Sequence, residues 1–197
     1  MTDKWTRAGA LRAMAAGGAV LGGGAVASRV LAPGATAAAP SRTRDAEILA
    51  FFLRMEQVQE GLYREAERAG VLDGPLREYV RVVAPQETEH VAFLAARAGS
   101  DGGPRPRSDF GDAVRTTEAF RSAAIELEEL TLSGYIGQGA NLTREAVGDV
   151  ARIVSVEARQ VAWLRDLAGE DPAPRAADAP REPDDILDEL RRRRYIL

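Results

Sequence analysis

Two stretches of this sequence repeat one pattern: Glu87-Thr88-Glu89-His90-Val91-Ala92-Phe93-Leu94 and Glu157-Ala158-Arg159-Gln160-Val161-Ala162-Trp163-Leu164. They lie 70 residues apart, and each leads to an Ala-Gly pair that ends the pattern. In both, a glutamate is followed three residues later by a second polar side chain, His90 or Gln160. Because residues three apart are neighbours on one face of a helix, each stretch predicts a helix that presents two polar side chains together.

A second repeat, with an offset of 72 residues, places a tyrosine seven residues after a glutamate. The pairs are Glu56 with Tyr63 and Glu128 with Tyr135. Seven residues turn a helix by about 700°, only about 20° short of two full turns, so each tyrosine lies two turns from its glutamate on the same face. The chain thus carries the same two polar patterns in each half.

Helical periodicity covers four segments of the chain. Apolar residues recur every three or four positions and stop at glycines, which predicts helices at residues 45–70, 76–99, 117–139 and 144–169. Pro85 falls inside the second segment and predicts a kink or a late start there. Thr143 is a suitable N-cap for the fourth helix.

The connections between these segments define the topology. The first and third connections are short, whereas residues 100–115 contain Asp-Gly-Gly-Pro-Arg-Pro, show no periodicity and form a long one. The alternating apolar and polar runs that strands need are absent from the sequence. We therefore predict an all-α protein, a four-helix bundle with one long crossover between the second and third helices.

Such a bundle points a set of polar side chains at its own axis, because these side chains lie beside the apolar stripe of each helix. The set contains four carboxylates, one imidazole and one amide: Glu56, Glu87, Glu128, Glu157, His90 and Gln160. Buried carboxylates that stand close together must be protonated, paired with cations or bound to metal. Two divalent ions would balance four carboxylates. Oxygen-rich ligands with a single imidazole suit iron or manganese better than a structural zinc.

The composition excludes several other kinds of site. The 197 residues include no cysteine and one histidine, so the chain holds no disulfide scaffold, thiolate nucleophile, cysteine-ligated metal or multi-histidine site. With 26 Lys and Arg against 30 Asp and Glu, the net charge is −4, which argues against nucleic acid as a partner.

Residues 1–39 are typical of a targeting segment rather than of the fold. A basic start precedes an uncharged stretch rich in alanine and glycine, and small residues at its end offer cleavage sites. The stretch Thr6–Arg12 resembles a twin-arginine export signal, with Ala8 in place of the second arginine. We therefore expect an exported, extracytoplasmic protein; an uncleaved anchor or an unstructured tail is the alternative.

The remainder of the chain, residues 170–197, follows the bundle. A Pro/Ala-rich linker leads to a short amphipathic piece, Asp184–Tyr195. The run Arg191–Arg194 within it is typical of a solvated face; contact with anionic lipid or with a partner protein is the alternative. Bundles often pair into homodimers, but nothing in the sequence specifies an interface.

The two repeats together resemble the ferritin-like superfamily over residues 45–169. Its di-iron members use a glutamate from each of two helices and Glu-x-x-His from each of the other two. Within that superfamily the chain is similar to exported bacterial ferritin-like proteins, including those called desiccation-related. The likeness is carried by Glu87–Leu94, Pro104-Arg105-Pro106, Asp109-Phe110 and Val156–Arg159.

The resemblance also implies which residues form the site. The implied metal ligands are Glu56, Glu87, His90, Glu128, Glu157 and Gln160, the last in place of a second histidine. Tyr63 and Tyr135 would lie beside the metals and tune or protect the site during electron transfer. The implied cofactor is iron or manganese, with two ions per chain, or one if the half with Gln160 is degraded. The implied activity is ferrous oxidation, iron handling or peroxide consumption, in protection against oxidative or desiccation stress.

A metal-free bundle with a structural or interaction role is the competing interpretation. In that protein, arginines would pair with the carboxylates and the two tyrosines would only fill the core; the candidates are Arg54, Arg152 and Arg159. Glu60, Glu126 and Glu129 are expected to be exposed or next to the site rather than ligands.

Overall fold

The computed structural model describes residues 39–197, except for the side chains of residues 100 and 101. The predicted export segment therefore lies outside the described residues, save for its last position. The described part is helical and contains no strand. Its α-helices are α2 (Arg42–Ala69), α3 (Gly74–Ala98), α4 (Thr117–Gly139), α5 (Arg144–Leu167) and α6 (Pro183–Arg192).

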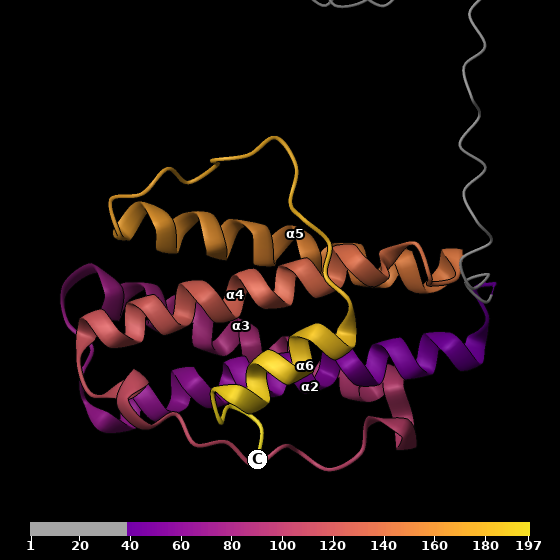
Figure 1. The fold of residues 1–197 in the computed structure, drawn as a ribbon, viewed down its shortest axis with the longest axis horizontal. Coiled ribbons are helices and arrows are strands. Elements are labelled where there is room, and N and C mark those ends of the chain that lie inside the picture. The colour runs from indigo at the N-terminus through magenta and orange to yellow at the C-terminus, as the bar shows by residue number, and fades with distance from the viewer. Residues whose placement is uncertain (1–38) are drawn as a thin grey trace, which may run out of the picture. The chain divides into compact units, whose positions relative to one another are not determined.

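Four of these helices form the predicted bundle (Figure 1). The short connections join α2 to α3 and α4 to α5, and each pair is antiparallel. Between the pairs, residues 99–116 include two short 3-10 turns, η1 (Gly99–Gly102) and η2 (Gly111–Val114). This crossover returns along the length of the bundle, so α4 runs in the same direction as α3 (Figure 1). The predicted fold class and long crossover are confirmed.

Local signals set the helix ends. The Thr143 side chain accepts a hydrogen bond from the Ala146 amide at 3.4 Å, which confirms it as the N-cap of α5. Asp45 of α2 accepts a second bond from the Thr143 backbone amide at 2.8 Å, and so ties the start of α5 to α2. At the end of α2, Gly70 adopts a left-handed φ of 68°, a conformation that glycine reaches without steric cost.

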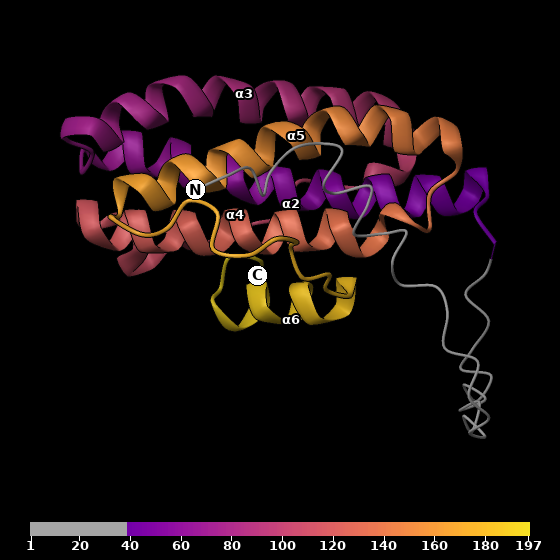
Figure 2. The ribbon, with the colours of Figure 1, turned by 90° about the horizontal axis from the view of Figure 1, so that it is seen from above.

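The alternative of a late start at Pro85 is wrong. Helix α3 begins at Gly74, with a proline in its first turn, where the missing amide costs nothing. It continues through Pro85, which is exposed, because residues on both sides pack against the bundle. Figure 2 shows α3 as one curved helix, as expected when a proline removes one backbone hydrogen bond.

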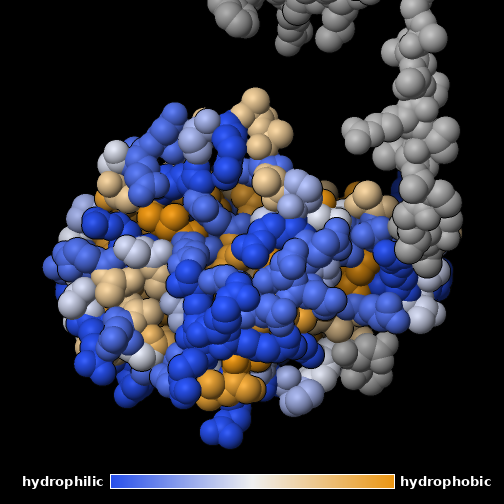
Figure 3. All heavy atoms as spheres, in the orientation of Figure 1, coloured by the Kyte–Doolittle hydropathy of each residue, from blue (hydrophilic) through white to orange (hydrophobic). Residues whose placement is uncertain are grey.

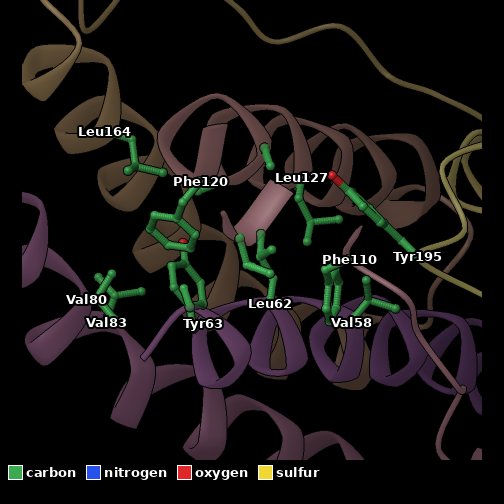
Figure 4. Close-up of a cluster of buried hydrophobic side chains, with 14 of the residues drawn as sticks. Val58, Leu62, Tyr63, Val80, Val83, Phe110, Phe120, Leu127, Leu164 and Tyr195 are labelled. Carbon is green, nitrogen blue, oxygen red and sulfur yellow. The ribbon is translucent and has the colours of Figure 1, made fainter. Parts of the chain in front are cut away.

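The hydrophobic core fills the space between the helices. The crossover and the C-terminal segment, which are not part of the four helices, cover one side of it. Figure 4 shows Val58, Leu62 and Tyr63 of α2 facing Phe120 and Leu127 of α4. At one edge, Phe110 of the crossover packs against Tyr195 of the C-terminal segment, with ring centroids 5.3 Å apart. The crossover and the tail thus close this side of the core together.

Helix α6 belongs to the folded unit. Its Ile186 and Leu190 are fully buried in the same core. The preceding chain lies directly on α4, where the Arg181 amide donates to the Ser133 carbonyl at 3.0 Å. A Cβ atom at Gly137 would stand 2.2 Å from the Arg181 carbonyl oxygen, so only glycine permits this approach.

The arginine run at the end of α6 forms ion pairs with acidic side chains. Arg194 contacts Asp109 of the crossover at 3.0 Å, and Arg193 contacts Glu126 of α4. Arg191 and Arg192 pair within the helix. The face shown in Figure 3 is mostly hydrophilic, with hydrophobic residues in separate small areas. Within residues 39–197, none of the helices combines the length and apolar character needed to cross a bilayer.

Replacing Gly137 by alanine should displace the segment before α6. We expect the free energy of unfolding to fall by about 1–3 kcal/mol, because the new methyl group would overlap a backbone carbonyl. Gly139→Ala is the matched control, since nothing lies within 4 Å of its Cβ position. Urea denaturation followed by circular dichroism measures both variants. Equal stability of the two variants would contradict the close packing of this segment.

Candidate metal centre

Each helix of the bundle contributes one fully buried glutamate to its middle. They are Glu56 of α2, Glu87 of α3, Glu128 of α4 and Glu157 of α5, and none exposes any surface. Their helix neighbours are core residues such as Met55 and Leu127, which pack the same faces inward. The structure therefore brings together the four carboxylates that the two repeats placed on inward faces.

His90 completes a compact cluster with three of these glutamates. Its Nδ1 lies 3.0 Å from an oxygen of Glu157, 3.3 Å from one of Glu56 and 3.7 Å from one of Glu87. Ligand atoms from all four residues lie within 4.8 Å of one another. The cluster is formed by residues of α2, α3 and α5. Glu128, on α4, is not part of it.

The facing atoms of this cluster lack hydrogen-bond partners. They are Glu56 Oε2, both oxygens of Glu87, His90 Nδ1 and Glu157 Oε1. A buried polar atom without a partner costs free energy, and several acceptors aimed at one point repel one another. A cation at that point would satisfy them together. Three carboxylates and one imidazole are a suitable donor set for iron or manganese.

Glu128 is held in a different way. The Tyr63 hydroxyl donates to its Oε1, and the Gln59 amide donates to its Oε2 at 2.8 Å. The same amide also reaches Glu157 Oε2 at 3.3 Å. Both oxygens of Glu128 therefore have protein donors, unlike the oxygens that face His90.

Each predicted tyrosine contacts the glutamate of the opposite helix rather than its own. Tyr63 donates to Glu128, and Tyr135 donates to Glu56 Oε1. Helices α2 and α4 run antiparallel, so a seven-residue spacing on each brings a tyrosine level with the other helix's glutamate. Burial, and then the adjacent carboxylate, raises the pKa of both tyrosines, which remain protonated donors.

Two residues near the centre were not predicted from the sequence. Gln59 is fully buried, and its position one turn after Glu56 was the available signal. Tyr79 of α3 is also fully buried, and its hydroxyl lies 3.2 Å from that of Tyr63. The ring of Tyr79 meets that of Trp163 edge-on, with centroids 5.0 Å apart. No repeat marks Tyr79, so only the tertiary structure identifies it.

Gln160 lies at the centre's edge, on the side that opens to a surface pocket. Its amide nitrogen donates to Gln86 Oε1 at 3.1 Å, and its own Oε1 is buried without a partner. His90 and Gln160 both line a surface pocket of about 420 Å³ between α3 and α5. Trp163 lines it as well. This pocket brings solvent to the imidazole side of the centre.

The arginines that were candidates for pairing with the buried carboxylates form no ion pair with them in the described part of the chain. Within residues 39–197, no ion pair joins Arg54, Arg152 or Arg159 to any of the four buried glutamates. The outlying acids have their own partners, as expected of residues that are not ligands. Glu60 pairs with Arg64 and Arg105, Glu126 with Arg193, and Glu129 with Arg165.

Burial makes the carboxylates at the centre hard to ionise. It raises the pKa of Glu87 and Glu128 well above the usual glutamate range, and the charge of Glu157 adds to the effect. The pKa of Glu157 is raised by burial and by Glu56. Burial alone would lower the pKa of His90, but the three carboxylates around its ring raise it well above its ordinary value. The folded, metal-free centre therefore holds extra protons.

One family model matches this chain. It is described as a ferritin-like domain and covers residues 44–170, all of the four-helix bundle except the first two residues of α2. No curated protein matches the chain significantly.

The metal-free protein should lose stability as the pH rises from about 5 to about 8. Between its unfolded pKa of 4.5 and its raised folded pKa, a glutamate keeps its proton when folded and loses it when unfolded. Folding then takes up protons, so the free energy of unfolding falls as the pH rises. The raised pKa of His90 acts in the same direction.

Urea denaturation of metal-stripped protein at both pH values measures this dependence. Glu87→Gln should flatten it, because the amide carries no titrating proton. Glu78→Gln on the exposed side of α3 should leave it unchanged, because Glu78 already pairs with Arg81 in solvent. A wild-type slope in the Glu87 variant would contradict the origin assigned to the effect.

Proposed function

The chain belongs to the ferritin-like domain family, and on that premise we propose that it oxidises ferrous iron outside the cytoplasm. Iron, or manganese in its place, would be held by Glu56, Glu87, His90 and Glu157. The observation that carries the proposal is the set of partnerless donor atoms from these residues, gathered within 4.8 Å. When bound, the metal would supply the redox chemistry that no side chain of this cluster has.

The protein's own residues would bind the ion and control access to it. The three carboxylates supply negative charge in a region that core residues shield from water, and the imidazole supplies a nitrogen. The surface pocket beside His90 gives ferrous ions and small oxidants a route to the centre. A buried donor set with one open side is the arrangement that turnover requires.

We assign the tyrosines a supporting role in this chemistry. Tyr135 donates to Glu56, and so fixes which oxygen of that carboxylate faces the cluster. Tyr63, Tyr79 and Trp163 form a contiguous row from Glu128 to the surface pocket. Such oxidisable side chains beside a redox centre are suited to protecting it from excess oxidant.

Export and a stress role complete the proposal. The basic, alanine-rich and glycine-rich start of the sequence supports export, and the likeness to desiccation-related proteins supports protection against oxidants or drying. An extracytoplasmic setting would place the protein where metal ions and peroxide enter the cell.

A metal-free bundle is the second candidate, and one observation favours it. Both oxygens of Glu128 accept hydrogen bonds from protein donors, so this carboxylate has partners without a cation. In that protein, the remaining carboxylates would stay protonated, and the fold would serve a structural or interaction role.

Metal content and ferrous oxidation separate the two candidates. Wild-type protein, purified from its native host, should contain iron or manganese by elemental analysis and should oxidise added ferrous iron. Glu87→Gln should lower metal affinity by at least about tenfold, because it removes a carboxylate whose two oxygens have no other partner. The oxidation rate should fall with the affinity.

Glu78→Gln serves as the matched control on the same helix, since Glu78 is exposed and paired with Arg81. It should retain wild-type metal content and rate. If wild type and both variants contain no metal, and added iron leaves their thermal stability unchanged, the metal-free candidate is correct.

Export is tested by locating the natural protein and sequencing its N-terminus. We expect it outside the cytoplasm, with a chain that begins near Pro40, after the run of small residues at the end of the leader. Arg7→Gln should reduce export, whereas Arg29→Gln, beyond the uncharged stretch, should not. An intact chain found in the cytoplasm would contradict the proposal.

A further inference from the structure

We propose that this centre is built for one metal ion and that the amide of Gln59 takes the place of a second. The inference rests on the proposed function, because it concerns the same centre. It chooses one ion over the two that four buried carboxylates suggest, and it assigns the loss of the second ion to Gln59 rather than to Gln160 alone.

The two oxygens of Glu157 divide the centre into unlike halves. Oε1 faces His90 at 3.0 Å and has no hydrogen-bond partner, whereas Oε2 accepts from the Gln59 amide at 3.3 Å. Every partnerless carboxylate oxygen of the centre lies in the His90 cluster: Glu56 Oε2, both oxygens of Glu87 and Glu157 Oε1. On the other side, both oxygens of Glu128 accept from protein groups. Free carboxylate oxygens are therefore found in one half only, while the other half keeps one partnerless oxygen, Gln59 Oε1.

Gln59 is placed to satisfy the oxygens of the second half that Tyr63 does not reach. Its side chain is fully buried, and its amide nitrogen lies between Glu128 and Glu157, at 2.8 and 3.3 Å from their oxygens. An NH2 group donates two hydrogen bonds, which matches the two oxygens it faces. A cation bridging the same two carboxylates would need the position that this nitrogen occupies. In this orientation the amide nitrogen donates to both carboxylates, and the amide oxygen, Gln59 Oε1, is buried without a hydrogen-bond partner.

Comparison of the two repeats shows that a glutamine in this position occurs in one half only. The offset of 72 residues places Thr131 of α4 where α2 has Gln59. Thr131 is one turn before Tyr135, whose hydroxyl binds Glu56 in the His90 half. Threonine is too short to extend a terminal amide toward those carboxylates, so that half stays open.

Manganese(II) titration tests the number of ions directly. Manganese stays divalent in air, so binding is measured apart from oxidation, and the electron paramagnetic resonance signal of free manganese counts the bound ions. We expect about one ion per wild-type chain. Gln59→Thr gives α2 the residue of its repeat partner, and we expect it to raise the number to about two.

Two further variants make the result specific. Gln59→Glu keeps the side-chain volume, replaces the donor by acceptors, and should also bind about two ions. Adding Glu128→Gln to Gln59→Thr should return the number to about one, because the second ion would depend on that carboxylate. Gln138→Thr is the control, since this buried glutamine contacts Glu182 and Asn141 rather than the centre. Circular dichroism checks that each variant is folded.

The outcomes separate this inference from the proposed function. Two ions in wild type would overturn the single-ion inference and leave metal binding intact. One ion in wild type and in both folded Gln59 variants would overturn the role given to the amide. No ion in any folded variant would overturn both proposals. One ion rising to two, with no change in Gln138→Thr, would support both.

Discussion

The burial of four carboxylates in the middle of the bundle is the constraint on which the rest of the structure depends. Each oxygen removed from water needs a donor, a proton or a cation, and the protein meets this need unequally. Phenol and amide groups satisfy Glu128 entirely and Glu56 in part. The oxygens around His90 face its Nδ1 without forming a hydrogen bond to it, and this imbalance gives the centre its capacity for a cation.

The topology makes these donors available. Because the long crossover returns the chain to the end where α3 begins, α4 runs antiparallel to α2. With this direction, the tyrosine of each helix lies level with the glutamate of the other. Tyr63 of α2 therefore donates to Glu128 of α4, and Tyr135 of α4 donates to Glu56 of α2. The crossover and the C-terminal segment then seal the core through Phe110 and Tyr195. Segments outside the four-helix repeat thus complete the hydrophobic core on that side.

Most of the bundle could be read from the sequence, because helix periodicity, caps and glycine stops are local properties. The ends of α4 and the Thr143 cap of α5 agree with the prediction. The start of α3 was the exception, because the helix does not begin at Pro85. Residues before and after Pro85 pack into the bundle, and this packing outweighs the loss of one backbone hydrogen bond. The inward faces of the glutamates were also predictable. The roles of Gln59 and Tyr79 were not, because their partners lie on other helices and the repeats mark neither residue.

An all-α bundle, its long crossover and a set of inward carboxylates with one histidine follow from local patterns and spacing along each helix, so they are predictable without a structure. Only the tertiary structure decided which carboxylates form a cluster with His90 and which one the protein satisfies itself. Hydrogen bonds between helices depend on their direction, their relative level and the reach of side chains such as Gln59. Those quantities are set by packing between segments far apart in the chain, and a one-dimensional pattern does not contain them.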